Sequence, residues 1–145
     1  MSPPAHSPGG EPPLGEERLD TRLSGVAALR GMRASLRALA DGALGPQRLA
    51  DALVAATELA TNSLVHAGPG AVTLRASRDR RRLRVEVHDG GPGIGSRRLV
   101  RPPATSVGGR GLYLVTKLAD RWGSRDRPLA MVWFEIDREA VAAGG

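Results

Sequence analysis

The stretch ELATNSLVHA, from Glu58 to Ala67, combines an apolar helical pattern with a row of polar residues. The polar row contains Glu58, Asn62 and His66, which lie four residues apart and therefore share one face of a helix. An apolar stripe recurs at helical spacing over the same segment and comprises Leu49, Leu53, Ala56, Ala60 and Leu64. At about 100° per residue, this stripe and the polar row point to nearly opposite sides of the helix. The pattern predicts a helix from Pro46 to about His66 that packs on one side and offers an acid, an amide and an imidazole on the other.

The flanking sequence predicts the other elements of an α+β fold. Helical spacing of apolar residues indicates a first helix near residues 26–41 and a third helix near residues 112–120. Alternation of apolar and polar residues indicates a strand near residues 83–88, and β-branched and apolar residues indicate another near 71–76, joined to it by an arginine-rich hairpin. A short extended segment is expected near residues 21–23 and a last strand at 131–136. This order predicts a two-layer α/β sandwich, in which three helices cover one face of a mixed, mainly antiparallel sheet.

Length and composition indicate one domain flanked by two tails. The chain has 145 residues, and its first 19 contain five prolines and few apolar residues. We therefore expect a disordered tail over residues 1–19, a folded domain over 20–139 and a flexible tail over 140–145. The sequence has no cysteine and no apolar run near the roughly 20 residues of a membrane span. These features predict a cytoplasmic protein that has no membrane segment.

The formal charge of +6 raises the question of nucleic-acid binding. The densest basic cluster, Arg78 to Arg84, lies in the predicted hairpin, where a solvated turn explains it. Aromatic residues make up only 3% of the chain, which leaves few rings to stack on bases. We expect no nucleic-acid partner.

Two glycine-rich clusters complement the polar row of the predicted helix. The first, DGGPGIG, begins with Asp89 at the end of an alternating strand, where a carboxylate could accept a hydrogen bond from an exocyclic amine such as that of adenine. The second, GGRG over residues 108–111, precedes a predicted helix, and free backbone N–H groups at a helix start suit phosphate oxygens. Asn62 offers the hard oxygen that Mg²⁺ prefers, and Glu58 offers a base.

Together these motifs resemble a known family. ELATNSLVHA is similar to the N box of the GHKL superfamily of ATP-binding domains, DGGPGIG to its D-x-G-x-G box, and GGRGLYLV to its second glycine box. The resemblance spans about residues 26–137 and implies the Bergerat fold. Within the superfamily, the chain most resembles the small anti-sigma-factor serine/threonine kinases.

The resemblance implies a site for ATP and Mg²⁺. Asn62 would bind Mg²⁺, Asp89 would bind the adenine amino group, and Glu58 would act as general base. Residues 96–107 would form a mobile lid over the nucleotide. The remaining nucleotide-binding residues would be Gly91, Gly93 and Ile94 at the adenine and Gly108, Gly109, Arg110, Gly111 and Leu112 at the phosphates.

Two residues near these motifs keep alternative interpretations. Arg110 is either a solvated loop residue or a charge contact to the β- or γ-phosphate. For His66, a structural role at the end of its helix is favoured over catalysis.

The implied function is a regulatory kinase that transfers the γ-phosphate of ATP to a serine or threonine of a small STAS-type anti-sigma-factor antagonist. A sigma factor would be a second partner, and relatives also form homodimers. One departure favours an alternative, a non-catalytic module that binds ATP or ADP and acts as a switch. Relatives often carry Gly-Thr before the last strand to support the adenine-binding acid, whereas this chain reads RPLAMVWFEI. Support for Asp89 would then come from elsewhere, such as Thr73.

Overall fold

The computed structural model describes residues 17–67, 72–89, 107–125 and 130–138. It contains five strands, three α-helices and one short 3₁₀ helix within these residues. In chain order they are β1 (Glu17–Leu23), η1 (Val26–Ala28), α1 (Leu29–Ala40), α2 (Pro46–Ala67), β2 (Val72–Arg78), β3 (Arg82–Asp89), α3 (Val107–Leu118), β4 (Arg121–Arg125) and β5 (Ala130–Asp137).

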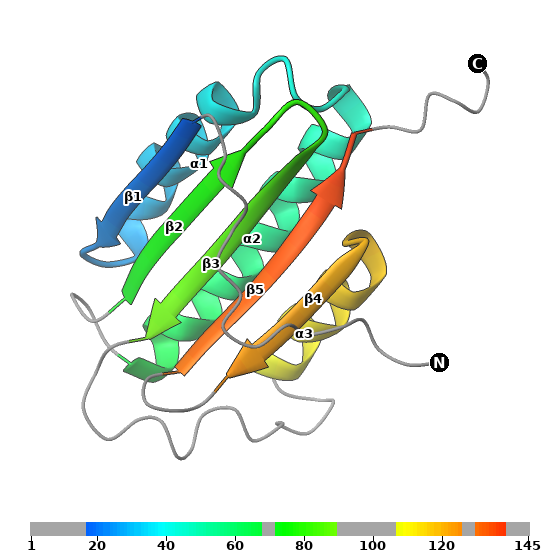
Figure 1. The fold of residues 1–145 in the computed structure, drawn as a ribbon. Helices are drawn as coiled ribbons and strands as arrows, with labels where there is room; N and C mark the ends of the chain where they lie inside the picture. The colour runs from blue at the N-terminus through cyan, green and yellow to red at the C-terminus, as the bar shows by residue number, and fades with distance from the viewer. Residues whose placement is uncertain (1–16, 68–71, 90–106, 126–129, 139–145) are drawn as a thin grey trace.

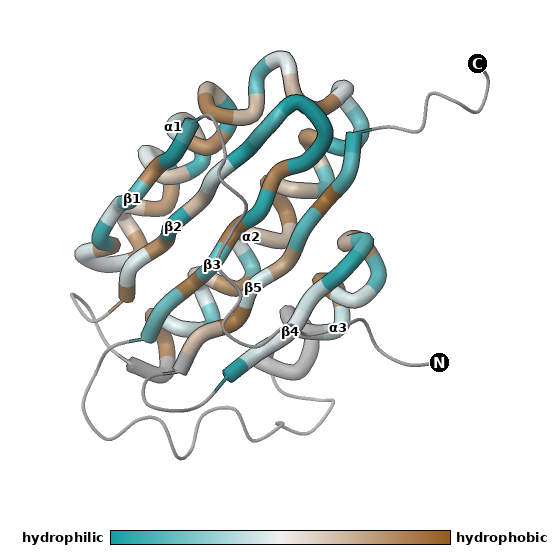
Figure 2. The backbone as a smooth tube through the Cα atoms, in the orientation of Figure 1, coloured by the Kyte–Doolittle hydropathy of each residue, from teal (hydrophilic) through white to brown (hydrophobic). Residues whose placement is uncertain are grey.

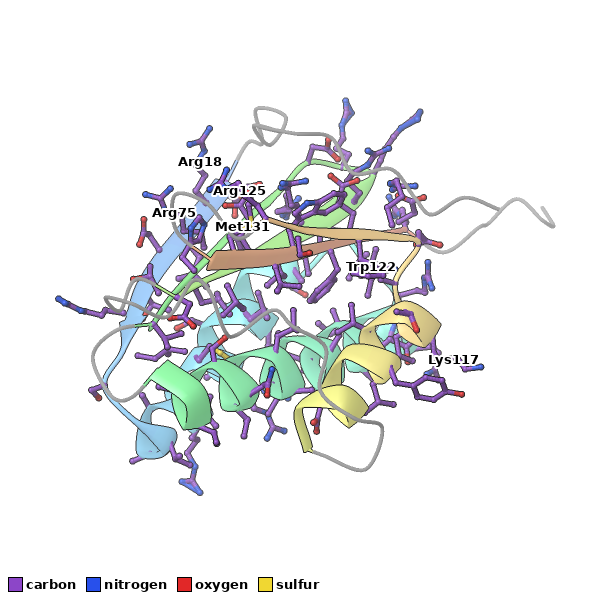
Figure 3. The ribbon with its side chains drawn as sticks, turned by 90° about the horizontal axis from the view of Figure 1, so that it is seen from below. Arg18, Arg75, Lys117, Trp122, Arg125 and Met131 are labelled. Carbon is purple, nitrogen blue, oxygen red and sulfur yellow. The ribbon has the colours of Figure 1, made fainter. Side chains whose placement is uncertain are left out.

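The strands form one sheet in the order β1-β2-β3-β5-β4 (Figure 1). All four pairings between the described strands are antiparallel, so no parallel pair accounts for the mixed character that we expected. The helices cover one face of this sheet, and Arg18, Arg75 and Met131 lie on the other face (Figure 3). The predicted two-layer α+β architecture is confirmed.

The core lies between the sheet and the helices. Leu83, Val85 and Val87 alternate along β3 and are fully buried, as the period-two pattern predicts. Phe134 and Ile136 extend the same buried face onto β5. Burying one such side chain stabilises the fold by about 1.5–3 kcal/mol, so this row contributes strongly to holding the sheet against the helices. Hydrophilic residues gather instead at the hairpin between β2 and β3 (Figure 2).

The central helix, α2, follows its predicted stripe closely. Four of the five stripe residues are buried and Leu49 is half-buried. Ala52, Ala55 and Leu59 are also buried, because α2 packs against α1 and α3 as well as against the sheet. The helix begins with Pro46, whose missing N–H is not needed in the first turn. This packing fixes the position of every residue along the polar row.

The connection from α1 to α2 is held by an arginine from the sheet. Arg78 of β2 donates from Nε to the carbonyl oxygen of Leu39 at 2.9 Å and from Nη2 to that of Asp41 at 2.9 Å. A cation there stabilises the last carbonyls of α1 and the negative end of its dipole. Gly42 follows with a φ of +87°, a conformation that favours glycine.

Two element boundaries differ from the sequence-based expectations, and one strand was not expected. β1 begins at Glu17, ahead of the predicted domain boundary at residue 20, because it pairs along its whole length with β2. The strand β4 was not predicted, since RWGSR lacks a clear apolar alternation. The third helix begins at Val107 and not near residue 112, because its glycines adopt helical conformation. The rest of both predicted tails lies outside the described residues.

The helix-free face of the sheet carries a buried ion network. The Glu135 carboxylate accepts hydrogen bonds from Arg84 Nη1 at 3.1 Å and from Arg121 Nε at 2.8 Å. Arg84 also donates from Nε to Glu86 at 2.9 Å, and its guanidinium lies 4.3 Å from the centre of the Trp133 ring. The charges that the pattern placed on the polar side of β3 are therefore paired within the sheet rather than solvated.

Candidate functional site

Three of the predicted motifs meet at one end of the molecule. β3 ends at Asp89, α2 ends at Ala67 and α3 begins at Val107, and these three points lie at the same end of the fold (Figure 1). The helices α2 and α3 also pack against each other. Residues separated widely in the sequence are therefore brought to one region.

Asp89 lies on the helix side of the sheet. Alternation along β3 places its side chain on the same face as Val85 and Val87, and only 6% of the residue is exposed. A buried carboxylate requires hydrogen-bond donors. A ligand amine is one group that can supply such a donor.

Glu58 and Asn62 lie one helical turn apart on α2, and both are half-buried. The Asn62 side-chain oxygen Oδ1 is buried and has no hydrogen-bond partner. A buried oxygen without a hydrogen-bond partner lowers the stability of the fold by about 1–3 kcal/mol. A ligand that supplies a positive charge or a hydrogen-bond donor would satisfy this oxygen. Mg²⁺ fits this requirement, because it prefers hard oxygen ligands and takes its other ligands from phosphates and water. The described residues contain no cluster of three or more His, Cys, Asp or Glu that could hold a metal ion by themselves.

The glycine cluster GGRG lies within the first turns of α3 rather than in a loop before it. The N–H groups of the first turn of a helix have no intrahelical acceptor, and here they include those of residues 107–109. The glycines therefore still provide N–H groups at a helix start, the position that suits phosphate oxygens.

A comparison with known protein families agrees with this arrangement of polar and glycine residues. The family model described as a histidine kinase-like ATPase domain matches residues 24–135, which is most of the chain. The chain belongs to the histidine kinase-like ATPase domain family. A comparison with curated proteins returned no significant match.

Membership in the histidine kinase-like ATPase domain family makes this an ATP-binding domain. The matched range contains the polar row of α2, Asp89 and the glycine cluster of α3. Within the described part of the chain, no helix is both long and apolar enough to cross a membrane.

Several predicted site residues lie outside the described part of this ATPase domain. They are Gly91, Gly93 and Ile94 and the lid segment before Val107. The side chains of His66, Arg110 and Leu112 also lie outside it, although the backbones of these residues are helical. Their proposed roles stay predictions.

Thr73 does not support Asp89. The register of β2 against β3 pairs Thr73 with His88 and pairs Asp89 with Val72. Because side chains alternate between faces, Thr73 lies on the helix-free face while Asp89 lies on the helix face. The sequence suggestion that Thr73 replaces the missing threonine is wrong for this reason.

Sequence reasoning missed the surroundings of Glu58. A groove of about 350 Å³ runs between α1 and α2, and Glu58 lines it together with Arg33 and Arg37. The arginines recur at helical spacing on α1, a signal that was present in the sequence. What the sequence lacked was the pairing of α1 with α2, which brings the two cations to the acid.

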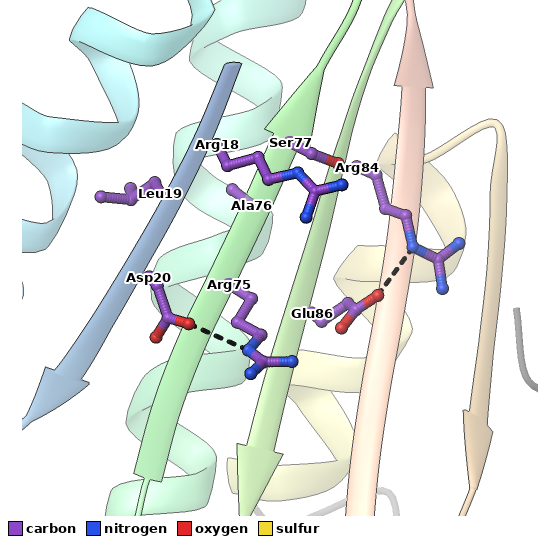
Figure 4. Close-up of a pocket in the computed structure, with 8 residues that line it drawn as sticks. All are labelled: Arg18, Leu19, Asp20, Arg75, Ala76, Ser77, Arg84 and Glu86. Atoms are coloured by element: carbon purple, nitrogen blue, oxygen red, sulfur yellow. Dashed lines mark hydrogen bonds and ion pairs between the residues drawn. The ribbon is translucent and has the colours of Figure 1, made fainter. Parts of the chain in front are cut away.

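A second pocket, of about 290 Å³, lies on the helix-free face and is separate from this region (Figure 4). Its arginines are largely neutralised by neighbouring acids, since Arg75 pairs with Asp20 at 3.1 Å and Arg84 pairs with Glu86 at 2.9 Å. We assign it no ligand.

Proposed function

We propose that this chain is a regulatory serine/threonine protein kinase of the anti-sigma-factor type. It would transfer the γ-phosphate of ATP to a serine or threonine hydroxyl of a small STAS-type antagonist. The observation that carries the proposal is the placement of Glu58 one turn from Asn62, with Glu58 also lining an open groove. A carboxylate beside the expected phosphates, and reachable by another protein, suits a base for a protein hydroxyl.

Each group has a defined task in this proposal. Asn62 Oδ1 would hold Mg²⁺, which neutralises phosphate charge when bound. The Asp89 carboxylate would accept a hydrogen bond from the adenine amino group and so orient the nucleotide. The first-turn N–H groups of α3 would donate to phosphate oxygens.

Transfer follows from this arrangement. The partner's hydroxyl oxygen forms a bond to the γ-phosphorus, and the bond from that phosphorus to the β,γ-bridging oxygen breaks. ADP leaves with the bridging oxygen. The hydroxyl proton passes to the Glu58 carboxylate. Phosphoryl transfer depends mainly on positioning and charge stabilisation, which these groups supply.

The test is transfer of labelled γ-phosphate from Mg·ATP to candidate antagonist domains encoded in the same genome. We expect Glu58→Ala to lower the rate by about 10²–10⁴-fold, the usual contribution of a general base. Asp51→Ala is the matched control, because Asp51 is an acid on the same face of α2, two turns before Glu58, and pairs with Gln47 at 3.1 Å. Equal rates for wild type and Glu58→Ala would reject Glu58 as the base.

A second candidate function is a switch module that binds ATP or ADP without transfer. One observation favours it: Ala130, which lacks a hydroxyl, is the β5 residue paired with Asp89. ATP binding by calorimetry, together with no transfer to any antagonist domain, would support the switch over the kinase. Sedimentation of the protein with and without a sigma factor tests that partner and the homodimer.

A further inference from the structure

The groove between α1 and α2 combines charge with an apolar floor. Arg33 and Arg37 of α1 form one wall, and Ala50, Leu53 and Val54 of α2 provide the apolar surface. Val54 is 44% exposed, so its side chain is available for apolar contact within the groove. The groove therefore offers both apolar contact and positive charge to a ligand.

Unpaired cations mark this side of the molecule. Arg30, Arg33 and Arg37 lie at i, i+3 and i+7 on α1, all are exposed, and α1 contains no acid. In the part of the chain that the structure describes, none of the three makes an ion pair, whereas Arg48 pairs with Asp120 and Arg121 pairs with Glu135 and Asp137. Like charges at this spacing oppose helix formation slightly, so an acidic partner would relieve a repulsion as well as gain attraction.

A polar atom within the groove also lacks a partner. The Thr57 hydroxyl oxygen is buried and has no hydrogen-bond partner. Thr57 lines the groove next to Glu58, which stands on the same row of α2 as Val54 and Asn62. The groove thus leads from the basic wall to the proposed base and on toward the metal-binding amide.

We propose that this groove docks an acidic segment of the protein substrate. The proposal rests on the proposed kinase function and identifies how its substrate is recognised. Carboxylates of the segment pair with Arg33 and Arg37, an apolar residue covers Val54, and the phosphoacceptor hydroxyl reaches Glu58. Glu58 repels carboxylates placed at its own end of the groove, which fixes the direction in which the segment binds.

Charge reversal tests the docking site. The double variant Arg33→Glu/Arg37→Glu, the groove variant, is compared with Arg80→Glu/Arg81→Glu, the hairpin variant. Arg80 and Arg81 are exposed on the β2–β3 hairpin, and both double variants change the net charge of the protein by the same amount. In the phosphotransfer assay we expect the groove variant to raise KM for the antagonist about tenfold or more, with kcat and ATP affinity unchanged. An unchanged KM, or an equal rise in the hairpin variant, would overturn the proposal.

A binding assay separates this proposal from the kinase assignment. The probe is a fluorescent 12-residue peptide of glutamate and leucine with one serine, and a peptide with lysine in place of glutamate is its control. We expect wild type and the hairpin variant to bind only the acidic peptide, and the groove variant to lose at least tenfold in affinity, even if no transfer is detected. Equal weakening in both variants overturns the site. Duplex DNA is a second probe. If wild type binds DNA as tightly as the acidic peptide, and the groove variant loses this binding, the groove is a general polyanion surface and the proposed protein-specific site is overturned.

Discussion

Asp89, the last residue of β3, is paired in register with Ala130, the first residue of β5. Directly opposed residues of antiparallel strands share a face, with Cβ atoms about 4.5–5.5 Å apart. The proposed adenine-binding acid is therefore paired in register with an alanine, a residue that has no hydroxyl. The register therefore identifies Ala130 as the position at which to test the effect of the missing threonine.

Ala130→Thr should tighten ATP binding. The new hydroxyl would donate to the Asp89 carboxylate and hold it in place, and one hydrogen bond contributes about 0.5–1.5 kcal/mol, or roughly two- to tenfold in Kd. Calorimetric titration with Mg·ATP measures the change. Ala130→Val is the control, because valine has nearly the shape of threonine and no hydroxyl. An equal gain in both variants would assign the effect to strand packing instead.

Asn62→Ala should separate stability from nucleotide binding. Removal of an unsatisfied buried oxygen, and replacement by a better helix former, is expected to leave Tm unchanged or raise it. Affinity for Mg·ATP should fall at least tenfold, because the proposed metal ligand is lost. Chelation of Mg²⁺ should weaken ATP binding by wild type and have little effect on the variant. If chelation weakens both equally, Asn62 does not hold the metal.

The periodic parts of the fold were predictable from the sequence. The stripe of α2 and the alternation of β3 each follow one clear period, and each packs as that period requires. The positions of Glu58, Asn62 and Asp89 follow from the same periods, because a helix row and a strand end define them, while their roles in the site stay predictions.

The rest depended on contacts distant in sequence. Trp122 is the one large apolar residue of β4, so the sequence offers no alternating pattern there. The strand conformation of β4 comes from its pairing with β5. Thr73 was assigned to the wrong face because its register against β3 was unknown. The groove beside Glu58 required knowing that the arginine stripe of α1 packs alongside α2.

Gly123→Ala should destabilise the sheet edge. A Cβ at Gly123 would come 2.8 Å from Nε1 and 2.9 Å from Cε2 of Trp133, and the rigid indole also contacts Arg84. Such overpacking typically costs about 1–3 kcal/mol. Gly31→Ala is the control, because Gly31 lies within α1 with open space around its Cβ position, and alanine there should stabilise by about 0.5–1 kcal/mol. Urea denaturation of both variants measures the two opposite shifts.

Glu86→Gln should make the unfolding free energy of the protein less dependent on pH at acidic pH. Burial raises the pKa of Glu86, but hydrogen bonds from His88 Nε2 at 2.8 Å and Arg84 at 2.9 Å outweigh it, so the pKa lies below its usual value. On the facing strands, Arg75 stands opposite on β2 and the uncharged Trp133 on β5.

A carboxyl whose pKa is lowered by folding stabilises the fold above its unfolded pKa of about 4.5, and this contribution disappears as pH falls through the folded value. At pH 7 we expect the variant to lose about 1.5–3 kcal/mol, the usual contribution of hydrogen bonds to charged groups. The difference from wild type should shrink between pH 5 and pH 3, as measured by unfolding free energy. The exposed-residue variant Glu17→Gln is the control and should follow wild type. A difference for Glu86→Gln that stays constant with pH would show that packing, and not the charge of Glu86, stabilises this face of the sheet.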